Sequence, residues 1–142
     1  MGDWDYSRAA ARASLGSSLR RFKFAVVADG AITDKDAPSD VLPALGDDRA
    51  MPGMRWGEER GRARAIGGLD AAYPIPLGGH ARIRARAGAA PVTLRGFESS
   101  RNWVLGAEIG GVWSLPVGSI IIAGGFNSRG RSRFDIIAGQ IF

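Results

Sequence analysis

The strictest constraint in this sequence is a two-residue alternation between Asn102 and Ser114. One set of alternate residues carries no charge and has a tryptophan at each end: Trp103, Leu105, Ala107, Ile109, Gly111 and Trp113. The intervening residues are small or polar, with Glu108 at their centre. Because successive side chains of a β-strand point to opposite faces, the pattern predicts a strand with one apolar face. Ten residues at about 3.3 Å each, tilted by roughly 40°, span about 25 Å, the height of the apolar band of an outer-membrane barrel.

The same alternation recurs along the chain. It predicts further strands at about 6–15, 19–31, 62–73, 80–89, 119–126 and 133–142, with a first turn at 16–18. The Ala-rich segment 6–15 is equally compatible with a helix by propensity. In every segment one set of alternate residues is uncharged, and nearly every segment places charge on the other set. The sequence therefore predicts an all-β, antiparallel fold of about seven strands.

Two arrangements fit strands of this kind. In a soluble sandwich the uncharged faces form the core, whereas in a membrane barrel they meet lipid and the charges line the lumen. The uncharged faces are rich in Ala and Gly, which would pack a sandwich poorly. With the long loop external, an aromatic belt falls at one end of the strands, formed by Phe22, Tyr73, Trp113 and Phe142, with Trp103 at the opposite interface. We therefore predict one domain, residues 1–142, that forms an antiparallel transmembrane β-barrel of about seven or eight strands.

Composition narrows the function classes. The chain has 19 Lys and Arg against 14 Asp and Glu, a basic balance that raises nucleic acid as a partner. The arginines alternate with apolar residues, which makes a poor groove-reading surface, so we expect no nucleic-acid partner. A soluble all-β module that binds nucleic acid or another polyanion through an Arg-rich strand face remains the alternative. The absence of cysteine and the single His80 argue against a thiolate or His-based metal site and against catalysis, and we expect no cofactor.

No apolar run reaches the length of a transmembrane helix, and the mean hydropathy is −0.05. The first residues lack the basic and apolar regions of a signal peptide, so the barrel interpretation implies a processed chain. Seven strands are too few for a barrel, and an open edge cannot lie in lipid. Three routes to closure are open: an unrecognised strand in 32–51, pairing with a second copy, or pairing with another fragment.

The longest irregular stretch, about 32–60, is rich in Pro, Gly and acidic residues, and loops of this length are usually functional or disordered. In a barrel the lumen would carry a charge cluster formed by Arg62, Arg64, Arg82, Arg84, Arg86, Asp70 and Glu108. One hypothesis is that the loop folds back and plugs the lumen through pairs between these arginines and Asp47, Asp48, Glu58 or Glu59. The other is that the arginines are hydrated or face the acids of the strands, Asp29, Asp70 and Glu108.

The order of several segments resembles a known family. Residues 45–58, which read Leu-Gly-Asp-Asp-Arg-Ala-Met-Pro-Gly-Met-Arg-Trp-Gly-Glu, resemble the large inward-folded loop of the bacterial surface antigen barrels. Residues 67–76 resemble the next strand and its periplasmic turn, and residues 125–134 resemble the last hairpin. Five strands after the loop is also the family count. The end of the chain, with Phe134, Ile136 and Phe142, looks like the signal that the barrel-assembly machinery reads.

These barrels form the C-terminal part of outer-membrane assembly factors, two-partner secretion transporters and some patatin-like phospholipases. The resemblance implies a location in the bacterial outer membrane, contact with the lipid bilayer and the assembly machinery, and a pore or scaffold for protein insertion or translocation. It singles out the loop residues Asp47, Asp48, Met51, Pro52, Gly53, Trp56, Glu58 and Glu59.

The loop departs from the family pattern at its tip. Pro52 stands where the family often has an Arg that pairs with acids on the next two strands. Asp70 fits the first acid, but Arg86 stands where the second is expected. The ion pair that locks the loop is therefore either missing or reversed in polarity.

Overall fold

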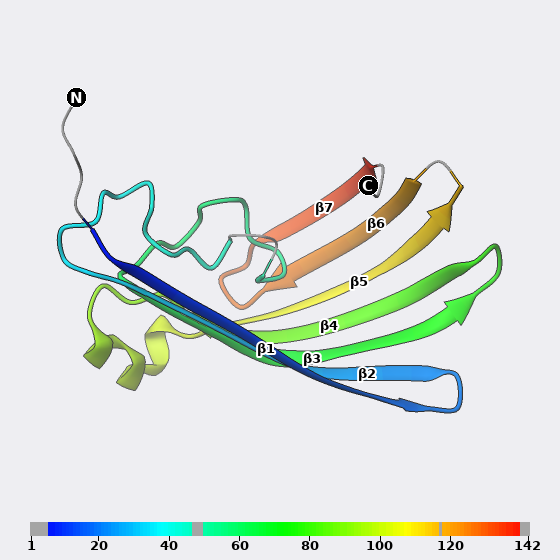
Figure 1. Cartoon of the computed structure of the whole chain (residues 1–142), viewed down its shortest axis with the longest axis horizontal. Coiled ribbons are helices and arrows are strands. Elements are labelled where there is room, and N and C mark those ends of the chain that lie inside the picture. Colours follow the sequence, from blue (N-terminus) through cyan, green and yellow to red (C-terminus); the bar gives the residue numbers. More distant parts are fainter. Residues whose placement is uncertain (1–5, 47–49, 117, 140–142) are drawn as a thin grey trace.

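The computed structural model describes residues 6–46, 50–116 and 118–139, and these form one curved sheet (Figure 1). Its strands are β1 (Arg8–Leu19), β2 (Phe22–Thr33), β3 (Ala63–Ile75), β4 (Gly79–Ala89), β5 (Val104–Leu115), β6 (Gly118–Asn127) and β7 (Ser132–Gly139). Each strand pairs antiparallel with the next, in the order β1 to β7. Two short 3₁₀ helices, η2 (Leu94–Glu98) and η3 (Ser100–Asn102), lie between β4 and β5. The predicted all-β, antiparallel fold of about seven strands is confirmed.

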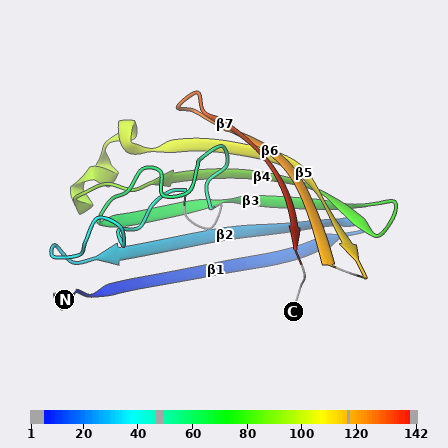
Figure 2. The ribbon, with the colours of Figure 1, turned by 90° about the horizontal axis from the view of Figure 1, so that it is seen from above.

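The sheet is not closed into a barrel, and β1 and β7 form its two edges (Figure 2). Within the described part of the segment 32–51 the chain forms no additional strand after β2. The segment makes an isolated bridge there, between Ala44 and Arg60. Closure by an unrecognised strand within the described residues is therefore wrong, because the backbone of this segment is used to fold the loop on itself.

The first hairpin differs from the prediction. The turn expected at 16–18 is part of β1, where Gly16 pairs with Ala25 and Ser18 pairs with Lys23. The chain turns at Arg20 and Arg21 instead, and Arg20 adopts a positive φ of 55°. Cross-strand pairing with β2 thus outweighs the turn preference of Gly and Ser and the helix propensity of the Ala-rich segment.

The two faces of the sheet differ completely in charge. Alternate residues of all seven strands form a convex face without a charged side chain. Large apolar side chains on this face are exposed, for example Leu105 at 62%, Phe126 at 64% and Ile136 at 68%. The charged side chains lie on the concave face. The predicted uncharged side of every strand, and the charge on the other side of nearly every strand, are therefore confirmed.

The long loop between β2 and β3 lies over the concave face, as both views of the ribbon show (Figures 1 and 2). A small core forms where it meets the sheet: Leu45, Ala50, Met51, Met54, Ile66 and Val104. Most of this core comes from the loop rather than from the strands.

Among the described residues, no helix has the length and apolar content needed to cross a membrane.

Candidate functional site: the ion-paired concave face and its covering loop

Glu108 of β5 is the centre of the first ion-paired cluster. It lies directly opposite Arg84 of β4 in the sheet register. Its carboxylate accepts hydrogen bonds from Arg84 Nε at 2.9 Å and Nη2 at 2.7 Å, and from Arg82 Nη2 at 3.1 Å. The Glu108 side chain is 6% exposed, so its single negative charge, held in a two-pronged contact with Arg84, offsets one of the two positive charges in a poorly hydrated site.

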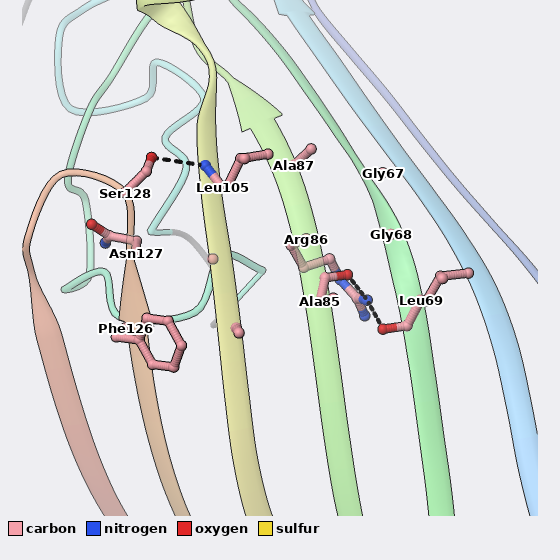
Figure 3. A pocket seen from close by; sticks show the side chains of 12 residues that line it. Gly67, Gly68, Leu69, Ala85, Arg86, Ala87, Leu105, Phe126, Asn127 and Ser128 are labelled. Atoms are coloured by element: carbon pink, nitrogen blue, oxygen red, sulfur yellow. Dashed lines mark hydrogen bonds between the residues drawn. The ribbon is translucent and has the colours of Figure 1, made fainter.

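Arg86 and Asp70 form the second cluster. Asp70 of β3 lies opposite Arg84, and Arg86 reaches it diagonally, with Nη2 2.6 Å from Asp70 Oδ1. Arg86 Nη1 also donates to the Leu69 carbonyl at 3.0 Å (Figure 3). Asp70, which fits the family pattern, and Arg86, which departs from it, therefore pair with each other across neighbouring strands.

Asp29 of β2 joins the third cluster to the loop. It accepts a hydrogen bond from Arg12 Nε of β1 at 3.1 Å and is paired with Arg64 of β3. Arg64 Nη1 donates to the carbonyl of Ala44 in the loop at 2.9 Å. One buried arginine thus ties three strands to the covering segment.

The structure brings together most of the predicted charge cluster. Six of its members lie in these networks: Arg64, Arg82, Arg84, Arg86, Asp70 and Glu108. Arg62 precedes β3 and makes no ion pair within the described ranges. The hypothesis that the arginines face acids of the strands is supported, whereas Asp47 and Asp48 lie outside the described residues.

Glu58 and Glu59 pair elsewhere than predicted. Glu58 lies 2.8 Å from Arg131, and Glu59 lies 3.6 Å from Arg129, both in the turn between β6 and β7. Antiparallel hydrogen bonds between the two arms of the loop, such as Leu45 N to the Glu59 carbonyl at 3.2 Å, hold the acids beside that turn. The hypothesis that these two glutamates pair with the arginines of the strands is therefore wrong.

The tip of the loop is held by close backbone approach. Met51, Pro52 and Met54 are buried against the sheet. Gly125 of β6 faces the tip, and a Cβ atom there would lie 2.8 Å from the Gly53 nitrogen. Gly53 itself has a φ of 71°, which favours glycine. Pro52 thus occupies the place of the family's tip arginine. The close approach of Gly53 and Gly125 holds the tip where an ion pair would hold it in the family.

One side chain of the sheet binds the tip directly. Arg133 of β7 donates from Nη1 to the Met54 carbonyl at 3.0 Å, while its Nε lies 2.7 Å from Asp135. The sequence prediction did not assign this contact. The alternation in 133–142 places Arg133 on the charged face, but alternation alone does not say which segment a side chain meets.

The aromatic residues lie mainly at the turn ends of the hairpins. The rings of Phe22 and Tyr73 lie 4.8 Å apart, at the ends of the first two hairpins. Trp113 lies near the turn of the third hairpin, opposite Gly79. Trp103 lies at the other end of the sheet, just before β5, and donates to the Phe97 carbonyl at 2.9 Å. Phe142 is outside the described residues.

The remaining residues singled out by the resemblance are exposed. Trp56 in the loop is 68% exposed, and Phe134 and Ile136 of β7 are each 68% exposed. Phe134 and Ile136 lie on the convex face, where they continue the apolar surface to the β7 edge of the sheet.

The convex face contains an apolar hollow of about 700 Å³ (Figure 3). Small residues on β3, β4 and β5, such as Gly67 and Ala87, form its floor. Leu69, Leu105 and Phe126 stand around it. The hollow is a consequence of small residues meeting in register, since Gly67 pairs with Ala87 and Ala85 pairs with Ala107.

No protein-family model matches this chain, and no curated protein matches it. Its function is therefore argued from the geometry of the two faces.

Proposed function

We propose that this chain is a section of the wall of a bacterial outer-membrane β-barrel, with its convex face in lipid and its concave face lining the lumen. The observation that carries the proposal is the uncharged convex face, which exposes large apolar side chains across the seven strands. Soluble monomers rarely expose contiguous apolar patches larger than a few hundred Å². Exposure of such a face to water costs free energy, and contact with hydrocarbon removes that cost, since transfer of apolar surface from water is favourable by about 25 cal/mol per Å².

The strand lengths support the same arrangement. β1, β2 and β5 each contain 12 residues. At about 3.3 Å per residue and a tilt of roughly 40°, such strands span about 30 Å along the membrane normal, close to the thickness of the hydrocarbon core. The aromatic pair Phe22 and Tyr73 lies at one end of this span, and Trp103 at the other, as expected for residues at the two membrane interfaces.

In the family that the sequence resembles, such a barrel is a pore or scaffold for the insertion or translocation of proteins, and we propose that role here. The loop bound over the concave face supports it, because a segment held across a lumen wall narrows the passage. In this proposal the chain has no catalytic role, and its partners are the lipid bilayer and the assembly machinery.

The open edges require additional strands, because unpaired backbone groups cannot lie in hydrocarbon. β1 and β7 run in the same direction, since the antiparallel sheet has an odd number of strands. A second copy in the same membrane orientation would therefore place its β1 parallel to β7. An all-antiparallel barrel needs an odd number of strands from a different segment, and we propose this closure in place of the homo-oligomer that the sequence suggested.

The faces can be tested by labelling, because the chain has no cysteine of its own. Ala85→Cys places a thiol on the convex face. Ala25→Cys places one on the concave face, beside a polar hollow that is lined by charged residues such as Arg12 and Asp70. After secretion into the outer membrane of a Gram-negative cell, we expect a water-soluble maleimide to label Ala25→Cys and to leave Ala85→Cys unmodified until detergent is added.

The reverse labelling pattern would overturn the membrane proposal, as would full labelling of both thiols together with recovery of the chain in the soluble fraction. A soluble chain that is retained on nucleic acid in low salt and released in high salt would favour the polyanion-binding alternative. The concave face argues against that alternative, because its arginines are already paired with Asp29, Asp70 and Glu108.

A further inference from the structure

The end of the first hairpin carries three cationic side chains, two in the turn between β1 and β2 and one at the start of β2. Arg20, Arg21 and Lys23 are exposed, and they form no ion pair within the described part of the chain. The other two turns at this end of the sheet, 76–78 and 116–117, contain no charged residue. Among the turns at this end of the sheet, positive charge is therefore concentrated at the first hairpin. These cations differ in this respect from the paired arginines of the concave face.

A second apolar hollow, of about 410 Å³, lies on the convex face beside this turn. It begins at Leu15 and Phe24, near the end of the first hairpin, and extends over β3 and β4 to Ile83. Its floor is formed by small residues, including Ala71 and Ala85. The hollow therefore offers a depression for a chain of methylene groups that starts close to the cationic turn.

Aromatic rings separate the charge from the hollow. Phe22 packs against Tyr73 with ring centroids 4.8 Å apart, and against Phe24 at 5.9 Å. Rings of this kind lie at the level of lipid headgroups. From the turn inwards, the surface thus presents cations, then aromatic rings, then an apolar depression. This order matches the anionic head, interfacial region and hydrocarbon tail of an acidic phospholipid.

We propose that this hairpin binds one acidic phospholipid, with its phosphate at Arg20, Arg21 and Lys23 and one acyl chain in the hollow between β1 and β4. The inference rests on the proposed membrane location. Lys23 alternates onto the concave side, and its long apolar stem lets the ammonium group reach the rim. A basic residue near a membrane surface favours an anionic lipid by roughly fivefold, and this preference weakens as salt is added.

The site can be tested by fluorescence quenching in vesicles. Leu19→Trp places a reporter at the turn end of the convex face, where Leu19 is 68% exposed. The full chain carrying this reporter is reconstituted in phosphatidylcholine vesicles that contain a minor fraction of dibrominated phosphatidylglycerol or dibrominated phosphatidylcholine. The signal of the chain without the reporter is subtracted. We expect the anionic quencher to act as if enriched several-fold around the reporter at low salt.

Two sets of variants test the head and tail contacts separately. Replacement of Arg20, Arg21 and Lys23 by Gln should remove the enrichment, whereas Arg95→Gln with Arg101→Gln, at the other end of the sheet, should preserve it. Ala71→Leu fills the floor of the hollow without changing charge and should lower the enrichment. Ala87→Leu, on the floor of the other convex hollow, is its matched control and should not.

Equal quenching by the two lipids, unchanged in the cation variants, would overturn the phospholipid site and leave the membrane proposal standing. Loss of the preference in the Arg95 and Arg101 control as well would also overturn it, because the effect would then reflect overall charge. If neither lipid quenched the reporter, the convex face would not lie in hydrocarbon, and the proposed function itself would fail.

Discussion

At the residue scale, Glu108 holds the centre of the concave face. Its carboxylate binds Arg82 and Arg84, and all three side chains are largely shielded from water. Charges in such a place are tolerated because they are paired and hydrogen-bonded, and removal of one partner leaves the others without compensation. The paired acids explain how the arginine side chains of several neighbouring strands can lie on the same face of one sheet.

Replacement of Glu108 by Gln should therefore destabilise the fold strongly. The amide keeps the shape of the side chain but leaves two half-buried guanidinium groups without a counter-charge, for which we expect a loss of about 3–5 kcal/mol in the free energy of unfolding. Urea unfolding in detergent micelles measures this loss. Glu98→Gln, exposed on η2, serves as control and should change stability by less than about 0.5 kcal/mol. Equal stability of the two variants would contradict the role given to Glu108.

Gly125 controls how closely the loop approaches the sheet. A methyl group at this position would lie 2.8 Å from the Gly53 nitrogen, so Gly125→Ala should push the loop tip away. We expect faster tryptic cleavage after the exposed Arg55 in this variant. The adjacent Gly124 faces the convex side. A Cβ atom at this position would lie 3.9 Å from the ring of Phe134, which is an ordinary van der Waals contact. Gly124→Ala should leave the cleavage rate unchanged, and equal rates in both variants would argue against the close approach.

At the element scale, the loop between β2 and β3 acts as a segment bound to the sheet at several separate points. Arg64 holds its first arm at Ala44, and Arg133 holds its tip at Met54. At its base, Arg131 pairs with Glu58. The contacts come from β3, β7 and the β6–β7 turn, so the loop crosses the concave face from one side of the sheet towards the other.

A loop held in this way should restrict passage through the proposed barrel. Replacement of residues 47–57 by a short Gly-Ser linker should therefore raise single-channel conductance in planar bilayers. The same linker in place of residues 94–101, the segment with η2 and η3 that does not cover the concave face, is the control (Figure 1). An unchanged conductance after removal of the loop would count against the narrowing of the lumen.

At the scale of the whole molecule, the odd number of strands decides how the sheet can close. Copies of the chain in one membrane orientation would meet through parallel β7 and β1 strands, whereas all the pairs in the sheet are antiparallel. In the proposed barrel, strands of another segment would complete the lumen opposite the paired arginines and acids of the concave face.

Cysteine cross-linking tests this closure. A chain with Ala9→Cys on β1 and Ala138→Cys on β7 should form no disulfide-linked oligomers in detergent, because a second copy does not supply the missing partner strand. Ala13→Cys with Ala28→Cys joins residues that are directly paired in the sheet, and it should form a disulfide within one chain. A ladder of oligomers from the edge variant on a non-reducing gel would favour closure by identical copies.

The sequence by itself determined the strands and their two faces, because alternation is a local property that side-chain direction translates directly into structure. It located six charged residues of the concave face and, among the described residues, the aromatic side chains Phe22, Tyr73, Trp103 and Trp113 at the strand ends. It misplaced the first turn, where cross-strand pairing overrides the preference of Gly16 and Ser17.

Only the tertiary structure decided which partners those charges take. Arg86 pairs with Asp70, and Glu58 pairs with Arg131, because the curvature of the sheet and the folding of the loop set distances between residues far apart in the chain. The open edges, the glycines that receive the loop tip and the hollows of the convex face also depend on register between strands. Local alternation carries no information about register, so these features appear only once the sheet is assembled.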